Sequence, residues 1–129
     1  MDKNSIRADL WAAIESHYEK KDFTESIRDA MFFISEIVRD NSGLEDKDGV
    51  KLIEAAFLGK NPSLLINNNQ TDTERNIQEG IGYALKGLIM SIRNPISHER
   101  VTYSEDSADA ILLYTNYLLK IIDKSKGKT

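Results

Sequence analysis

The stretch at residues 93–98, with the sequence RNPISH, places an arginine and a histidine close together in the chain. A guanidinium binds phosphate oxygens through two parallel hydrogen bonds, and an imidazole exchanges protons near neutral pH. Pro95 has no N–H and disfavours helical backbone before it, so we expect the preceding helix to end at Arg93. A tight turn would then bring Arg93 and His98 to one cleft. The alternative is that Arg93 is an ordinary helix-end cation and His98 a loop residue.

The composition fits a single globular domain. The chain has 129 residues, of which 40% are hydrophobic and 29% are charged. The sequence has no cysteine, which excludes a disulfide framework and a thiolate zinc site. Charged residues interrupt the first twenty positions and no apolar run is long enough to span a bilayer, so we expect a cytoplasmic protein without membrane attachment. The net charge of −4 means that any RNA contact requires a local cationic patch.

Apolar residues recur at helical spacing along most of the chain, which predicts an all-α, compact bundle of about five helices. The expected helices span residues 2–20, 22–43, 48–57, 73–93 and 104–123. Residues 59–72 form a long connection, and residues 124–129 are expected to be a disordered lysine-rich tail. The domain is therefore expected to span residues 1–123.

Helix starts are predicted from pairs that resemble capping arrangements, in which a side chain near the first turn bonds a free backbone N–H. These pairs are Asp22 with Glu25, Thr71 with Glu74, and Thr102 with Glu105. The helix after Asp22 is apolar on more than one side, because Phe32 and Phe33 lie beyond its core stripe. We therefore expect this helix to be central in the bundle, or to contribute to a subunit interface.

The helix expected at residues 73–93 carries two neighbouring stripes. The apolar stripe consists of Ile77, Ile81, Leu85, Leu88 and Ile92. The stripe of small residues consists of Gly80, Ala84, Gly87 and Ser91. A helical glycine costs about 1 kcal/mol relative to alanine, so we expect another backbone to approach the small stripe, within the bundle or across a dimer. Lys86 and Gly82 share the face of Arg93, which makes Lys86 a candidate second cation.

Several classes of site lack their sequence signatures. There is no nucleophile-elbow pattern, no phosphate-binding glycine loop and no cluster of metal ligands in the motif, so we expect no cofactor and no metal. The other histidine, His17, falls on the apolar stripe of the first helix. We interpret it as a partly buried packing residue rather than a ligand.

The 93–98 stretch resembles the R-x4-6-H motif of the HEPN superfamily (higher eukaryotes and prokaryotes nucleotide-binding), in which a polar residue such as Asn94 typically follows the arginine. More narrowly, the chain resembles the bacterial and phage family called Ymh over roughly residues 22–123. That resemblance runs through Asp48-x-x-Lys51-Leu52, Ala56-Phe57, Pro62, Gln78-x-Gly80, Gly87 and Arg93-Asn94-Pro95-x-x-His98. It implies a HEPN-like helical domain that forms a homodimer.

Many HEPN proteins resemble metal-independent endoribonucleases of toxin–antitoxin, abortive-infection and other phage-defence systems. The resemblance implies 2′-hydroxyl attack on RNA, with His98 as acid or base and Arg93 stabilising the phosphate. Asn94 would either orient the imidazole or contact the phosphate. Arg100 and Lys86 would extend the RNA-binding surface. One histidine cannot readily serve as both acid and base, so a two-fold dimer would supply a second His98. A cognate antitoxin or a neighbouring defence protein is a further expected partner.

The chain departs from the HEPN toxins in one position, because Arg100 stands two residues after the histidine, where those toxins often have tyrosine. Control by modification of that tyrosine is therefore not expected. Other HEPN proteins are non-catalytic, and fold membership does not decide function. Two alternatives thus remain open: a non-catalytic RNA- or nucleotide-binding module, and a structural dimeric helical interaction domain.

Overall fold

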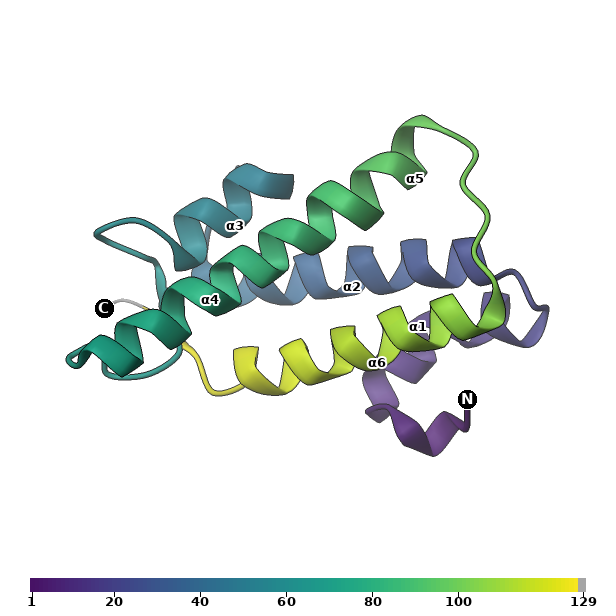
Figure 1. The fold of residues 1–129 in the computed structure, drawn as a ribbon, viewed down its shortest axis with the longest axis horizontal. Helices are drawn as coiled ribbons and strands as arrows, with labels where there is room; N and C mark the ends of the chain where they lie inside the picture. Colours follow the sequence, from purple (N-terminus) through teal and green to yellow (C-terminus); the bar gives the residue numbers. More distant parts are fainter. Residues whose placement is uncertain (128–129) are drawn as a thin grey trace.

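A computed structural model describes residues 1–127 and shows an all-α, compact bundle, as the sequence predicts (Figure 1). Short 3-10 and π-helical turns are labelled η. In chain order the elements are η1 (Lys3–Ser5), α1 (Ala8–Glu19), α2 (Phe23–Ser42), α3 (Gly49–Phe57), β1 (Leu64–Leu65), α4 (Asp72–Leu88), η2 (Ile89–Arg93), α5 (Asn94–His98), α6 (Glu105–Ile122) and β2 (Lys126–Gly127). No helix within residues 1–127 has the length and apolar character needed to cross a membrane.

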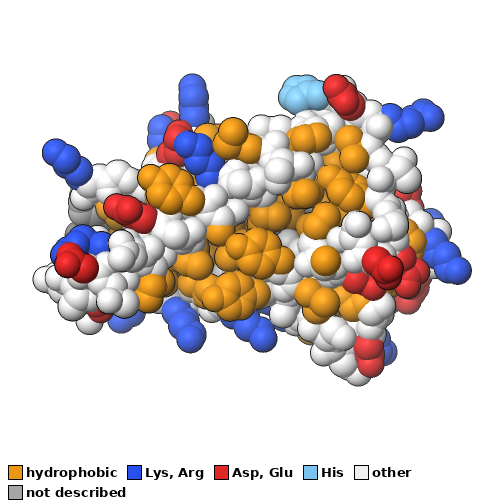
Figure 2. All heavy atoms as spheres, viewed as in Figure 1, with side chains coloured by type: hydrophobic (Ala, Val, Ile, Leu, Met, Phe, Trp, Pro, Cys, Tyr) orange, Lys and Arg blue, Asp and Glu red, His pale blue; other side chains and the backbone are white. Residues whose placement is uncertain are grey.

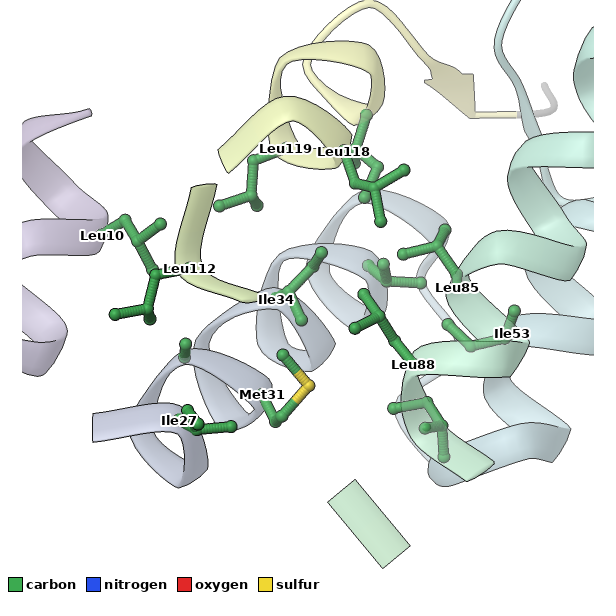
Figure 3. Close-up of a cluster of buried hydrophobic side chains, with 14 of the residues drawn as sticks. Leu10, Ile27, Met31, Ile34, Ile53, Leu85, Leu88, Leu112, Leu118 and Leu119 are labelled. Carbon is green, nitrogen blue, oxygen red and sulfur yellow. The ribbon is translucent and has the colours of Figure 1, made fainter. Parts of the chain in front are cut away.

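The central helix is α2, which was one of the two expectations for it. It packs against α1, α3, α6 and η2. Its side chains Ile27, Met31 and Ile34 lie in the middle of the core, and leucines from α1, α4 and α6 point toward them (Figure 3). Phe33 is half-buried against this core, whereas Phe32 is 69% exposed. The core is thus built around one face of α2, and Phe32 lies outside it.

Two of the three expected helix caps are confirmed. The Asp22 side chain accepts from the Glu25 N–H at 3.2 Å, and Thr71 forms a complete capping box with Glu74. The third expectation, Thr102 with Glu105, is wrong, because Ser104 caps α6. Thr24 on α2 binds the segment that precedes α6. Its Oγ1 donates to the carbonyl of Val101 and accepts from the N–H of Tyr103. The helix therefore cannot begin before Ser104.

The expected end of the fourth helix at Arg93 is also wrong, since α4, η2 and α5 form one continuous helical rod (Figure 1). The backbone widens to a π-helical turn in η2, where the Asn94 N–H donates to the carbonyl of Ile89. Pro95 then falls in the first turn of α5, directly after the π-helical turn. The π-turn thus lets the helix pass a proline.

The connection between α3 and α4 is anchored by Gln78, which is 2% exposed. Its Nε2 donates to the carbonyls of Phe57 and Leu64, and its Oε1 accepts from the N–H of Ile66. The strands β1 and β2 pair antiparallel next to this segment, with Leu64 opposite Gly127. The expectation of a disordered tail is therefore wrong for 126–127, because its backbone bonds to β1, while residues 128–129 lie outside the described residues.

The two glycines of the small stripe on α4 receive no other backbone from residues 1–127. A Cβ added to Gly80 or Gly87 would meet no heavy atom within 4 Å. The glycine that permits close packing is Gly82, where an added Cβ would lie 2.5 Å from Leu58 Cδ2 and 3.1 Å from Phe57 Cβ. Gly82 faces α3, whereas Gly80 and Gly87 lie on the surface.

Candidate functional site

The guanidinium of Arg93 reaches from the end of η2 to the start of α3. Its Nη2 lies 2.7 Å from Oδ2 of Asp48, the residue that precedes α3. The other carboxylate oxygen of Asp48 accepts from Nη2 of Arg39 on α2 at 2.9 Å. Asp48 is the N-cap of α3, so its one carboxylate joins α2, α3 and η2.

Gly49 makes room for this contact. It is buried and has a φ of +60°, which lies in the left-handed region that disfavours residues with a Cβ. An added Cβ would also lie only 3.0 Å from Nη1 of Arg93. Asp48 therefore binds the guanidinium of Arg93, and Gly49 leaves the space that the guanidinium occupies.

The two arginines differ in their remaining hydrogen-bonding capacity. Arg39 uses all its guanidinium nitrogens, because Nε donates to the carbonyl of Lys47, Nη1 to Glu36 and Nη2 to Asp48. Within residues 1–127, Nε of Arg93 has no partner and Nη1 makes only a 3.4 Å bond to Oδ1 of Asn94. The Arg93 side chain is 33% exposed. Arg39 thus positions Asp48, and Arg93 can still donate to an added anion.

Arg93 opens into a pocket of about 200 Å³ between α2, the start of α3 and α5. Its lining residues are Arg28, Met31, Phe32, Ser35, Glu36, Arg39, Asp48, Arg93, Ile96 and Ser97. The three arginines outnumber the two carboxylates, so the lining carries an excess of one positive charge. Such a pocket can accept an anion the size of a phosphate even though the whole chain is acidic.

The charges around Asp48 keep it ionised. Its partial burial acts to raise the pKa of the carboxyl. The hydrogen bond from the Gly49 N–H and the guanidinium groups of Arg93 and Arg39 outweigh that effect, so the pKa of Asp48 lies below its usual value. The ion pairs of the pocket are therefore present throughout the neutral range.

His98 does not join Arg93 in this pocket. It is exposed at the end of α5, does not line the pocket, and makes no hydrogen bond or ion pair with any residue in 1–127. The continuous helix is the reason, because five residues along an α-helix turn by about 140°. The expected tight turn is absent, and one chain alone does not place Arg93 and His98 in one cleft. Their assignment as a catalytic pair stays a prediction.

The other predicted site residues are dispersed. Asn94 is half-buried and contacts the Arg93 guanidinium, as its position beside the arginine suggests. Lys86 lies on the side of α4 that faces α3, where its Nζ binds Glu54 at 2.9 Å, and it does not line the pocket. Arg100 is exposed in the segment before α6 and lines a second pocket of about 430 Å³.

Three residues of the site were missed by sequence reasoning: Arg28, Glu36 and Arg39. They lie on α2 beside the apolar stripe, and Arg28 and Arg39 occupy nearly the same helical angle. The spacing of these two residues was the available signal, because charged residues that border a core stripe face the edge of a neighbouring helix. Asp48 was noticed only as a helix start and as part of the family pattern.

His17 is half-buried, as expected for a packing residue, and it also forms a specific pair. Its Nδ1 lies 2.6 Å from Oδ2 of Asp29, which joins α1 to α2. The hydrogen bond with Asp29 raises the pKa of His17 above its ordinary value, with smaller contributions from the charges of Asp29, Asp22 and Glu25. This pair lies outside the Arg93 pocket.

Comparison with known proteins identifies the family. Residues 4–122 match the family model described as "Protein of unknown function (Hypoth_ymh)". The chain belongs to the Hypoth_ymh family. The match confirms the resemblance to the Ymh family and covers nearly the whole chain. No curated protein and no solved structure matches this Hypoth_ymh chain.

Proposed function

We propose that this Hypoth_ymh protein is a HEPN-type, homodimeric, metal-independent endoribonuclease. The observation that supports the proposal most directly is the position of Arg93. Its guanidinium is fixed by Asp48 and Gly49, retains free donors, and faces a pocket with an excess of positive charge. A phosphodiester suits this arrangement, because its two non-bridging oxygens accept from adjacent guanidinium nitrogens.

The reaction is transesterification within the RNA strand. A base removes the proton of a 2′-hydroxyl, whose oxygen forms a bond to the adjacent phosphorus while the bond from phosphorus to the 5′ oxygen breaks. An acid protonates that 5′ oxygen, which leaves a 2′,3′-cyclic phosphate and a 5′-hydroxyl. Arg93 stabilises the charge on the non-bridging oxygens, Asn94 orients the guanidinium, and His98 transfers the proton. None of these steps needs a metal.

Two His98 side chains are needed to supply both acid and base, which is why we propose a homodimer. The dimer surface that we propose is the α4–α6 face, where hydrophobic side chains gather between the two helices (Figure 2). It forms an apolar groove of about 570 Å³ lined by Ala84, Gly87, Leu88, Met90, Ser91, Ile92, Ala110, Ile111 and Tyr114.

Three properties of the α4–α6 face favour a second copy of the chain as its occupant. Its lining contains no charged side chain, so a two-fold axis through it would oppose no like charges. The exposed Met90 and Tyr114 can enter the hollow above the small residue Gly87 of the other copy. Met90 and Ile92 belong to η2, so a partner docked here lies beside the helical rod that carries His98.

The biological setting that we propose follows from the HEPN resemblance. An RNase of this type would act in a bacterial or phage defence or toxin–antitoxin system. An antitoxin or a neighbouring defence protein would restrain it. The cationic contacts proposed for the RNA outside the pocket are Arg100 and, if its bond to Glu54 opens, Lys86.

A second candidate is RNA binding without cleavage. The exposed position of His98, away from the pocket of Arg93, favours this function in the single chain. It predicts that RNA binds to the wild-type protein and that Arg93→Ala weakens binding, while no cleavage products form.

The test is an RNA cleavage assay with EDTA present, in which wild type is compared with His98→Ala and with His17→Ala as the matched control. We expect His98→Ala to lose about 100-fold or more of the cleavage rate, because it removes proton transfer. His17→Ala should retain the rate. Equal cleavage by wild type and His98→Ala would refute the nuclease proposal. Binding without cleavage in wild type would establish the second candidate, and absence of both would leave an interaction domain.

A further inference from the structure

Phe32 is the most exposed of the large hydrophobic side chains on α2. It is 69% exposed, although its neighbours Met31 and Phe33 are buried and half-buried. It lines the Arg93 pocket and also a neighbouring pocket of about 490 Å³ formed by Ala13, Arg28, Asp29, Phe32, Phe33 and Glu36. Its ring therefore contributes little to the core and borders two hollows on the surface of α2.

Arg28 connects these hollows to each other and to the pocket that contains Arg100. It lines all three pockets. One of its guanidinium nitrogens binds the carbonyl of Ile96 at 3.2 Å, so the cation is held against α5. Its Nε binds Glu25, which leaves part of the guanidinium for a ligand. The result is a groove along α2 in which an aromatic ring lies beside two arginines, Arg28 and Arg93.

We propose that Phe32 stacks on an unpaired nucleobase of single-stranded RNA whose phosphate binds to Arg28 and Arg93. This inference rests on the proposed RNA-directed function and names its substrate class. Aromatic rings beside cationic grooves bind single strands because every base has a face that can stack. In a duplex both faces of each internal base are covered, so the ring selects unpaired RNA.

The surroundings of Phe32 favour a nucleotide over a protein partner. Arg28, Asp29 and Glu36 surround the ring in its two pockets. A protein that covered the ring with an apolar surface would bury these charges without replacing their hydration. A nucleotide supplies an apolar base face for the ring and a phosphate for the guanidinium groups. The α4–α6 face, by contrast, contains no charge in its groove and suits a protein partner.

The experiment measures binding of a fluorescein-labelled single-stranded 2′-O-methyl RNA by fluorescence anisotropy. This probe cannot be cleaved by attack of its own 2′-hydroxyl. Phe32→Ala should weaken binding about 5-fold to 150-fold, which corresponds to the loss of one stacked base. Phe32→Trp should retain binding. Tyr83→Ala is the matched control, because Tyr83 is 59% exposed on α4 and lines none of the three pockets along α2.

The same probe annealed to its complement tests the selection of unpaired RNA. Binding of this duplex should be weaker than that of the single strand and should not change in Phe32→Ala. Wild-type affinity in Phe32→Ala, combined with weak binding by Arg93→Ala, would overturn the stacking role and leave the proposed function standing. Failure of the wild type to bind either probe would overturn both. A change of molar mass in Phe32→Ala, measured by light scattering, would assign the ring to a protein contact instead.

Discussion

The carboxylate of Asp48 gives Arg93 its position. It accepts from Arg93 and Arg39 at once, and every guanidinium nitrogen of Arg39 already binds a protein oxygen. A phosphate that reaches Arg93 therefore meets a guanidinium whose orientation is already fixed, so little conformational entropy is lost on binding. Substitution of any one of the three residues changes the partners of the others, so their effects on RNA binding will not be additive.

The pair of His17 and Asp29 makes stability depend on pH at the residue scale. The pKa of His17 is raised in the folded state, so the stabilisation is complete below its ordinary value of 6.5 and is lost as pH rises through the folded value. We expect the free energy of unfolding of wild type to exceed that of His17→Gln more at about pH 5.5 than at about pH 8.5. Urea denaturation at the two pH values measures this difference.

Asp29→Asn is the matched variant for this prediction, because it removes the charge that raises the pKa of His17 and keeps the shape of the side chain. It should reduce the pH dependence in the same direction. A difference between wild type and His17→Gln that stays constant with pH, or grows toward alkaline pH, would contradict the assignment of the pair.

Sequence reasoning found some site residues and missed others for a physical reason. Arg93 and Asn94 could be recognised because they adjoin in the sequence and belong to one motif. Asp48 lies 45 positions before Arg93, and only the packing of α3 against the α4–α5 rod brings them together. Arg39 and Arg28 were missed because their role depends on the same packing, which no local pattern encodes.

At the scale of elements, the continuous rod α4–η2–α5 decides which residues share a site. A proline normally marks a helix boundary, because it lacks an N–H and clashes with the preceding turn. Here the backbone widens to a π-helical turn in η2 before the proline, and the helix continues to His98. Such turns are frequent at functional sites. The consequence is that His98 projects from a rigid rod rather than from a loop.

The contribution of the N-cap of α6 to stability can be tested by substitution. We expect Ser104→Ala to lower the free energy of unfolding by about 1 kcal/mol, because it removes the side chain that accepts from the Ser107 N–H. Thr102→Ala is the matched control and should cost less than about 0.5 kcal/mol, since Thr102 is exposed and caps nothing. Urea denaturation of both variants checks this, and an equal or larger loss from Thr102→Ala would contradict the assignment.

Helix starts with a local capping pair were predictable, as Asp22 and Thr71 demonstrate. The start of α6 near residue 104 was also expected, but its capping residue was wrongly assigned to Thr102. Thr24 binds Val101 and Tyr103 and holds the segment before α6 against α2, and Ser104 caps the helix. The same limit applies to β2, which forms only because β1 lies beside it. Elements that depend on a distant partner cannot be recognised from nearby residues.

At the scale of the whole molecule, the α4–α6 face is the main surface left without a partner inside the bundle. The sequence offered two explanations for Gly80 and Gly87, close approach within the bundle or across a dimer. The structure removes the first, because added Cβ atoms there would meet nothing within 4 Å. The proposal of a homodimer accounts for both glycines and for the exposed Met90, Tyr114 and Tyr117.

Gly87→Arg tests the homodimer. The substitution places a long charged side chain in the groove, so we expect a shift toward monomer in sedimentation or light-scattering measurements across a range of concentrations. The monomer should remain folded by circular dichroism, because the position is open and arginine favours helix more than glycine does. Glu15→Arg on the exposed side of α1 is the control and should leave the molar mass unchanged. A wild type that stays monomeric throughout would refute the dimer.

A series of contacts joins α3 to α4 along their whole boundary. Gln78 binds the connecting segment, and Leu58 packs over Gly82. Further along the boundary between the two helices, Lys86 binds Glu54 and Arg93 binds Asp48. These contacts hold α3 and α4 together as one unit. On the other side of the Arg93 pocket lies α2. It is joined to α3 and α4 by the bond of Arg39 to Asp48 and by core packing against α3 and η2. Thr24 and Arg28 of α2 also bind the segment from Ile96 to Tyr103. The wall of the pocket that carries Arg93 is therefore tied to the rest of the bundle from both sides, so a bound phosphate meets a guanidinium that the fold already holds.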